Sequence, residues 1–229
     1  MTLETFPSAE AAAAAAAQAI AGKLSRPGDK RLMVTGGRGP GAVYDRLAQT
    51  ELDWAHVTVT LSDDRFVPLD APESNEAMVR ARLMQGHAAA ARLVGLNGHE
   101  RTPAAAAAAI EPTIRALLPF DATLLGMGPD GHIASLYATS VGVAADLDPD
   151  AERLAVGVRS PGWEPYVPRI SLTGRALFDA GLIVLLVGGE QKRHVIEQVL
   201  ADVAYAPPVS ALIRQTKAPV RILWSPDAA

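Results

Sequence analysis

The 229-residue chain contains no cysteine, which excludes disulfide bonds, thiolate metal sites and a cysteine nucleophile, and is compatible with a reducing compartment. It also lacks an excess of basic residues. The formal net charge is −4 with both signs interspersed, so no basic stripe predicts a nucleic-acid partner. No run reaches the roughly 18 to 20 strongly apolar residues that a membrane span needs. We therefore expect a soluble, cytoplasmic protein, whose oligomeric state the sequence leaves open.

The start of the chain is rich in alanine but lacks the basic residues and leucine-rich core of a signal peptide. Ser8 is a good helix N-cap, and helix propensity is high over residues 11–24, before Pro27 and Gly28 end the segment. We therefore predict a helix here rather than a cleaved leader.

Apolar runs alternate with helical segments along the rest of the chain. This alternation predicts an α/β fold, a doubly wound, mostly parallel sheet with helices on both faces. No linker or fixed-period repeat divides the sequence, so we assign residues 1–229 to a single domain. We expect a kink or break near Pro112. The predicted strands are 31–35, 55–61, 121–126, 153–158, 169–173, 181–189 and 219–224, and the predicted helices are 11–24, 42–49, 75–84, 103–118 and 190–201.

Glycines or carboxylates follow three of these strands, in the stretches 36-GGRGPG-41, 62-SDDRF-66 and 126-GMGPDGH-132. In a parallel sheet the three stretches would meet at one edge, where open α/β proteins bind ligands. The first resembles a phosphate cradle, because its glycines let backbone N–H groups approach an anion at a helix N-terminus. A tight strand-to-helix turn explains it equally well. It lacks the signatures of ATP-binding and dinucleotide-binding loops, which disfavours ATP and NAD.

Asp130 and His132 suit a general base whose imidazole lies beside a carboxylate. Considered in isolation, a histidine that caps the next helix or binds the loop is the commoner case. The segment 63-DDR-65 is likewise typical of a solvated turn with a local ion pair. We assign the remaining histidines to the surface or to helix packing, and no spacing of ligands predicts a metal site. These other histidines are His56, His87, His99 and His194.

Three segments, taken together, resemble the 6-phosphogluconolactonase family within the glucosamine-6-phosphate isomerase/deaminase superfamily. They are 62-SDDRFVPLDAPESNEAMVRARL-83, 121-DATLLGMGPDGHIASLY-137 and 187-VGGEQKRHVIEQVL-200, and they occur in the family's order. The resemblance implies hydrolysis of 6-phosphoglucono-1,5-lactone to 6-phosphogluconate in the oxidative pentose phosphate pathway. It implies a small sugar-phosphate lactone as the partner and no cofactor.

The resemblance also implies roles for individual residues. His132 would be the general base that activates water, and Asp130 would orient it. Asp63 and Arg65 would lie at the sugar end of the cleft, and Asn75 would cap a helix or touch the ligand. The residues placed against the substrate phosphate would be Gly36, Gly37, Arg38, Arg169 and Lys192.

The sequence departs from the family pattern in two places. Arg38 and Gly39, before Pro40, stand where relatives usually carry two hydroxyl residues, so phosphate binding there would use a guanidinium and backbone N–H groups. Residues 138–140 replace a common proline, so the loop beyond the helix expected after His132 would run differently. Two alternatives stay open. A glucosamine-6-phosphate deaminase or isomerase would need a glutamate that this motif lacks, and a non-catalytic sugar-phosphate sensor would keep the cradle without the chemistry.

Overall fold

The computed structural model describes residues 2–158 and 166–227, and within them seven strands form one sheet in which every neighbouring pair is parallel. This sheet confirms the predicted α/β class and its parallel character. It also gains two short edge strands that the sequence analysis did not predict. The strand order is β1 (Leu3–Thr5), β10 (Val220–Ser225), β9 (Ile183–Gly188), β6 (Ala122–Gly126), β2 (Lys30–Val34), β3 (Val57–Leu61) and β5 (Arg92–Val94).

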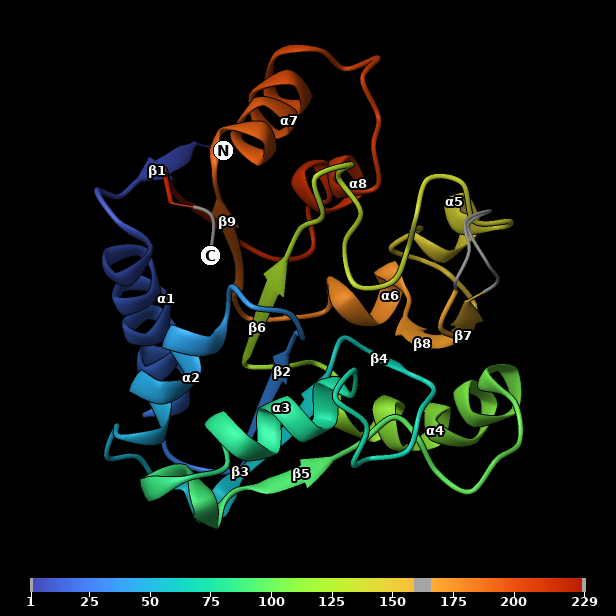
Figure 1. The fold of residues 1–229 in the computed structure, drawn as a ribbon. Coiled ribbons are helices and arrows are strands. Elements are labelled where there is room, and N and C mark those ends of the chain that lie inside the picture. Colours follow the sequence, from blue (N-terminus) through green and yellow to red (C-terminus); the bar gives the residue numbers. More distant parts are fainter. Residues whose placement is uncertain (1, 159–165, 228–229) are drawn as a thin grey trace.

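Helices pack around this sheet, and Figure 1 shows α1 and α2 side by side at its left, with α7 and α8 near its upper end. The helices predicted at 11–24, 42–49, 75–84, 103–118 and 190–201 are all present. None of the helices within the described residues is long and apolar enough to cross a membrane. The helices are α1 (Ala9–Leu24), α2 (Gly41–Ala48), α3 (Asn75–Arg82), α4 (Pro103–Leu117), α5 (Val143–Asp146), α6 (Gly174–Leu177), α7 (Glu190–Ala201) and α8 (Val209–Arg214), with 3-10 turns η1 (Trp54–His56) and η2 (Gly86–Ala90).

The strand order reverses direction between β2 and β6, at the middle of the sheet. The chain runs outward from β2 through β3 to β5, and then returns to β6 before running outward on the other side through β9 to β10. Because the connections after β2 and β6 diverge, a crevice opens at the carboxyl ends of these two strands. Two of the glycine-rich stretches, 36–41 and 126–132, lie at this point.

A second, antiparallel sheet corrects the prediction for two strands. Residues 153–158 and 169–173 do not extend the parallel sheet, and instead supply β7 (Ala155–Val158) and β8 (Arg169–Leu172). β8 also pairs with β4 (Asp63–Arg65), which the sequence analysis treated as the start of a polar loop. The pairing of β4 with β8 was not evident in the sequence, because it joins segments more than 100 residues apart.

Two local predictions are also corrected. α4 continues from Pro103 to Leu117 with Pro112 inside it, so the helix does not break there. No helix follows His132 directly. The chain folds back instead, through short bridges of Ile133 with Met127 and Leu136 and a positive φ of 49° at Ala134.

Alanine gives α1 a face that can lie close to the rest of the core. Ala12, Ala13, Ala16 and Ala17 are buried, and the helix contacts α2, β9 and β10. Small side chains allow this close approach, because a larger residue at the same position would need space that neighbouring atoms already fill. Gln18, on the same helix, is exposed.

Ala16→Leu is therefore expected to lower the free energy of unfolding by about 1–3 kcal/mol, because it overpacks a filled site. Gln18→Leu adds a similar side chain to the exposed side and should change stability by less than about 0.5 kcal/mol. Urea unfolding of both variants measures the difference. Equal stability of the two variants would contradict the close packing of α1.

Candidate active site

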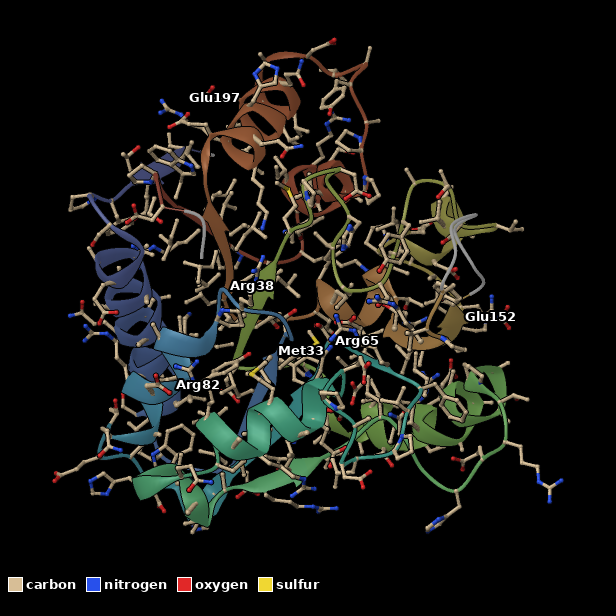
Figure 2. The ribbon with its side chains drawn as sticks, in the orientation of Figure 1. Met33, Arg38, Arg65, Arg82, Glu152 and Glu197 are labelled. Atoms are coloured by element: carbon tan, nitrogen blue, oxygen red, sulfur yellow. The ribbon has the colours of Figure 1, made fainter. Side chains whose placement is uncertain are left out.

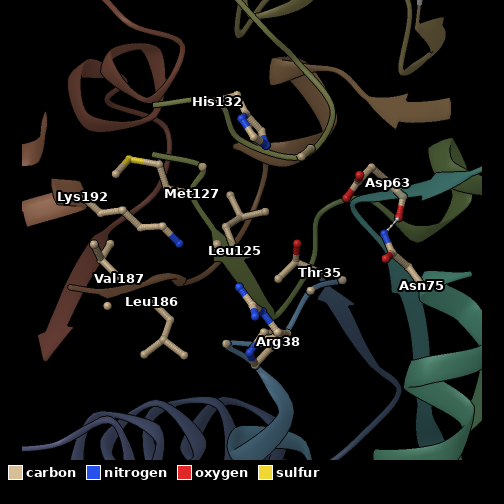
Figure 3. Close-up of a pocket in the computed structure, with 18 of the residues that line it drawn as sticks. Thr35, Arg38, Asp63, Asn75, Leu125, Met127, His132, Leu186, Val187 and Lys192 are labelled. Carbon is tan, nitrogen blue, oxygen red and sulfur yellow. Dashed lines mark hydrogen bonds between the residues drawn. The ribbon is translucent and has the colours of Figure 1, made fainter. Parts of the chain in front are cut away.

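One pocket of about 520 Å³ lies at the crevice and is lined by nearly all of the residues that the sequence analysis selected. Figure 3 shows Arg38, Lys192, His132 and Asp63 arranged around it. Asp130 does not line the pocket but contacts His132. The selected residues that do line it are Gly36, Gly37, Arg38, Asp63, Arg65, Asn75, His132, Arg169 and Lys192.

The imidazole of His132 is held by Asp130, since Nδ1 lies 2.6 Å from Asp130 Oδ1. A carboxylate accepts hydrogen bonds and cannot donate them, so Nδ1 carries the proton and Nε2 of the neutral ring keeps its lone pair. The same carboxylate also accepts from the backbone N–H of His132 at 3.3 Å. This arrangement fixes the tautomer that a general base needs. The four other histidines are exposed, as the sequence predicts for surface positions.

Gly128 leaves room for this pair, and Gly131 lets the loop turn between its two members. A Cβ at Gly128 would lie 2.1 Å from His132 Cε1 and 2.6 Å from Asp130 Oδ1, so any side chain would displace both groups. Gly131 has a φ of +83°, and a Cβ there would meet Pro207. The glycines of this loop are therefore required by the close approach of the histidine and aspartate, and by a left-handed turn.

Two cations mark one end of the pocket. Arg38 follows β2, and Lys192 lies in the first turn of α7, so the N-termini of α2 and α7 both face this region. Burial lowers the pKa of Lys192, and the nearby charge of Arg38 lowers it further. Neither side chain forms an ion pair with a carboxylate of the described residues. Two unpaired cations at helix N-termini favour a multiply charged anion.

Asp63 lies on another side of the pocket and is only 4% exposed. Its two carboxylate oxygens accept hydrogen bonds from Ser62 Oγ at 3.0 Å and from Ser135 Oγ at 2.5 Å. The prediction of a solvated turn with a local ion pair at residues 63–65 is therefore wrong. The serine hydroxyls replace water around this carboxylate and so lower the free energy needed to bury it.

Asp64 is a structural residue that sequence reasoning missed. It is fully buried, and its carboxylate accepts from the backbone N–H groups of Arg65 at 2.8 Å, Asn75 at 2.7 Å and Glu76 at 3.2 Å. The last two are free N–H groups at the start of α3. Burial raises the pKa of Asp64 to about 6, against these hydrogen bonds, which lower it.

Asn75 joins the strand β4 to the glycine loop. Its Nδ2 donates to the carbonyl oxygen of Asp63 at 3.0 Å, and its Oδ1 accepts from Arg65 Nη1 at 2.6 Å. A Cβ at Gly36 would lie 1.9 Å from Asn75 Oδ1, so the loop can pass here only with a glycine. The cap of α3 is Ser74, whose Oγ accepts from the N–H of Ala77, and Asn75 is thus available to the pocket.

Ser135 and Tyr137 were also not selected from the sequence, although both lie in the segment that follows His132. Ser135 supports Asp63, and the Tyr137 ring packs 4.4 Å from the His132 ring, centroid to centroid. A single serine or tyrosine carries no positional signal by itself, so these contacts depend on the observed turn. Within the described residues no cluster of His, Asp or Glu could hold a metal ion.

Comparisons with known proteins show what the whole chain is similar to. The family model described as glucosamine-6-phosphate isomerases/6-phosphogluconolactonase matches residues 6–224. A 6-phosphogluconolactonase from Caulobacter vibrioides is 40% identical, over 97% of this chain and 97% of that protein. One from Rhizobium meliloti is 37% identical, over 95% and 94% respectively. A solved structure of a 6-phosphogluconolactonase from Shewanella baltica superposes with a TM-score of 0.91 at 32% identity, covering 98% of this chain and 97% of that one.

Gly128→Ala is expected to displace the His132 ring from Asp130, because the new Cβ overlaps both side chains. Gly126→Ala is the matched control, since a Cβ there meets nothing closer than Thr35 Cγ2 at 3.9 Å. The NMR chemical shift of the His132 Cε1 proton measures the effect. We expect a changed chemical shift in Gly128→Ala and a chemical shift like that of wild type in Gly126→Ala. An unchanged His132 signal in Gly128→Ala would disprove this packing.

Asp64→Asn tests the buried carboxylate. In the folded protein the pKa of Asp64 is about 6, above the ordinary value of 3.8, so the folded state holds this proton more tightly than the unfolded state. The stabilisation of the fold by this proton is complete below pH 3.8. It is lost as the pH rises through about 6. The variant lacks this group, while its amide oxygen can still accept hydrogen bonds from backbone N–H groups. Between about pH 4.5 and 7, wild type should lose on the order of 2 kcal/mol of unfolding free energy relative to the variant.

Urea unfolding of wild type and Asp64→Asn at several pH values gives this difference directly. If the stability difference between the two proteins stays constant across this pH range, Asp64 does not titrate there and the inferred cost of its burial is wrong.

Proposed function

We propose that this chain, which belongs to the glucosamine-6-phosphate isomerase/6-phosphogluconolactonase family, hydrolyses 6-phosphoglucono-1,5-lactone to 6-phosphogluconate. The observation that carries the proposal is the His132–Asp130 pair at the edge of a pocket whose other end holds two unpaired cations. The names of the curated relatives support the same substrate. The reaction would be the lactone hydrolysis of the oxidative pentose phosphate pathway.

The chemistry needs one base and one position for water. Nε2 of His132 accepts a proton from water, and the water oxygen attacks C1 of the lactone. The bond between C1 and the ring oxygen then breaks, and the imidazolium returns its proton to that oxygen. The product acid releases a proton and leaves as a carboxylate. Asp130 stabilises the imidazolium that forms between these steps, in the manner of other carboxylate–histidine pairs.

The phosphate of the substrate would occupy the end formed by Gly36, Gly37, Arg38 and Lys192. Gly37 has a φ of +91°, a conformation that favours glycine and lets the loop turn sharply before α2. Arg38 supplies a guanidinium where relatives usually carry a hydroxyl group. A phosphate dianion gains charge-assisted hydrogen bonds from both cations, which positions C1 of the sugar relative to His132.

The segment after His132 argues against the deaminase alternative. In deaminases this segment carries a glutamate that assists opening of the sugar ring. Here the matching position is Tyr137, whose ring packs 4.4 Å from the His132 ring, so the segment offers no carboxylic acid to the ligand. A sensor without catalysis would have no need for the fixed tautomer of His132. These observations favour a hydrolase over both alternatives.

Purified protein is expected to accelerate acid release from 6-phosphogluconolactone in the presence of EDTA. His132→Gln should remove most of this acceleration, because general base catalysis contributes about 10²–10⁴-fold. His194→Gln, at an exposed position of α7, is the matched control and should keep wild-type turnover. A pH-stat measures acid release, and an ammonia assay with glucosamine 6-phosphate tests for deamination.

Full turnover in His132→Gln would place the base elsewhere. Ammonia release without lactone hydrolysis would replace the proposed reaction by deamination, and wild-type protein that binds sugar phosphates without either reaction would be a sensor.

A further inference from the structure

The position of Lys192 in the pocket depends on the helix that carries it. Figure 3 shows its side chain directed into the pocket, and it forms no ion pair with a carboxylate of residues 2–158 or 166–227. A long side chain without an ionic partner has many rotamers, so its backbone decides which region the ammonium group can reach. The place where α7 begins therefore sets where this cation meets a ligand.

The start of α7 has no capping side chain. The helices α1, α3 and α4 begin after Ser8, Ser74 and Thr102, whose hydroxyl oxygens each accept from an N–H group of the first turn. α7 begins instead after Gly189, which has a φ of 85° and no side chain that could accept. The N–H groups of this first turn stay open to an anion, but the contact that usually fixes a first turn is missing.

Trp224 holds this turn from its carbonyl side. The indole Nε1 donates to the carbonyl oxygen of Gly189 at 3.0 Å, and the N–H of Gly189 donates to the carbonyl oxygen of Ser225 at 2.9 Å. The Gly189 carbonyl also accepts from the N–H of Arg193 at 3.2 Å, which is the first hydrogen bond of the helix. Because the indole binds a carbonyl group, it fixes the turn without covering any N–H group.

A second contact joins Trp224 to the same turn. The guanidinium carbon of Arg193 lies 4.5 Å from the centroid of the Trp224 ring, within the range of a cation–π interaction. Arg193 Nε also donates to Glu197 at 2.7 Å, and Figure 2 shows Glu197 on α7, well away from Arg38. Trp224 is only 4% exposed and does not line the pocket. The buried ring thus braces the start of α7 from outside the pocket.

We propose that Trp224 is a positioning residue for Lys192, which fixes the first turn of α7 and so sets where the ammonium group meets the phosphate. The inference rests on the proposed function, because that function places the substrate phosphate against Lys192. Charge-assisted hydrogen bonds need short distances, so a small shift of the helix start weakens them. Trp224 acts on binding and leaves the pair of His132 and Asp130 unchanged.

Trp54 offers a matched control for this role. It is 1% exposed, and its Nε1 donates to the carbonyl oxygen of Thr50 at 2.9 Å, so it makes the same kind of bond in an equally buried place. It lies in η1 and does not line the pocket. Trp54→Phe therefore removes the same donor as Trp224→Phe and leaves the start of α7 intact.

Calorimetric binding of 6-phosphogluconate to the full chain tests the proposal. Trp224→Phe should weaken binding about three- to ten-fold, the range expected for one lost hydrogen bond, and Trp54→Phe should change it by less than about two-fold. In a Lys192→Gln background the further weakening by Trp224→Phe should fall below about two-fold, because the two residues act as one unit. Turnover of saturating lactone by Trp224→Phe should stay within about two-fold of wild type, since the base is untouched.

Thermal unfolding checks that each variant is folded. If Trp224→Phe does not fold, β-(3-benzothienyl)alanine at position 224 replaces it. This amino acid keeps the two-ring shape and carries sulfur in place of the N–H group, so the same weakening of 6-phosphogluconate binding is expected.

Equal weakening of binding by Trp224→Phe and Trp54→Phe would overturn the inference. So would a Trp224→Phe effect that is as large in the Lys192→Gln background as in wild type, since Trp224 would then not act through Lys192. Hydrolysis measured on the same wild-type preparation separates the two claims. Protein that hydrolyses the lactone but gives either of these binding results disproves the positioning role, whereas protein without hydrolysis disproves the proposed function.

Discussion

The carboxylate of Asp64 sets the position of one whole side of the pocket. By accepting from the N–H groups of Arg65, Asn75 and Glu76, it fixes the short strand β4 against the start of α3. Successive residues of a strand point to opposite sides, so Asp63 and Arg65 face the pocket because Asp64 faces away from it. The alignment of β8 follows, since its residues pair with β4. The buried charge is therefore tolerated for the geometry that it imposes.

The parallel sheet and this antiparallel sheet contribute different chemistry. Loops after β2, β6 and β9 bring glycines, His132 and the helix N-termini to the carboxyl edge, where backbone N–H groups and dipoles favour an anion. β4 and β8 add long, charged side chains held by strand pairing. A ligand with two polar ends can thus bind across the boundary between the sheets, with its reacting carbon near His132.

The parallel sheet could be predicted from the sequence because its central strands carry their own signal. Residues 181–189 are apolar throughout, as a strand covered on both faces requires, and glycines mark the turn that follows. The sequence of β4 did not predict a buried strand, since Asp63, Asp64 and Arg65 are typical of a solvated turn. Their burial depends on Ser135 and on the start of α3, which are distant in the sequence. No local pattern could reveal partners that only the fold brings together.

Nearly all the residues that the resemblance to a family selected line the pocket, but the resemblance could not divide them between its two ends. That division depends on which groups neutralise one another. Asp63 lies on the same face of β4 as Arg65, and an ion pair between them would cancel the charge offered to a ligand. Ser62 and Ser135 occupy the carboxylate oxygens instead. Neutral hydroxyl groups satisfy the aspartate oxygens, so neither Arg65 nor Arg169 is drawn into a direct ion pair with Asp63, and their N–H groups stay free to meet an anion in the pocket even though it contains a buried carboxylate.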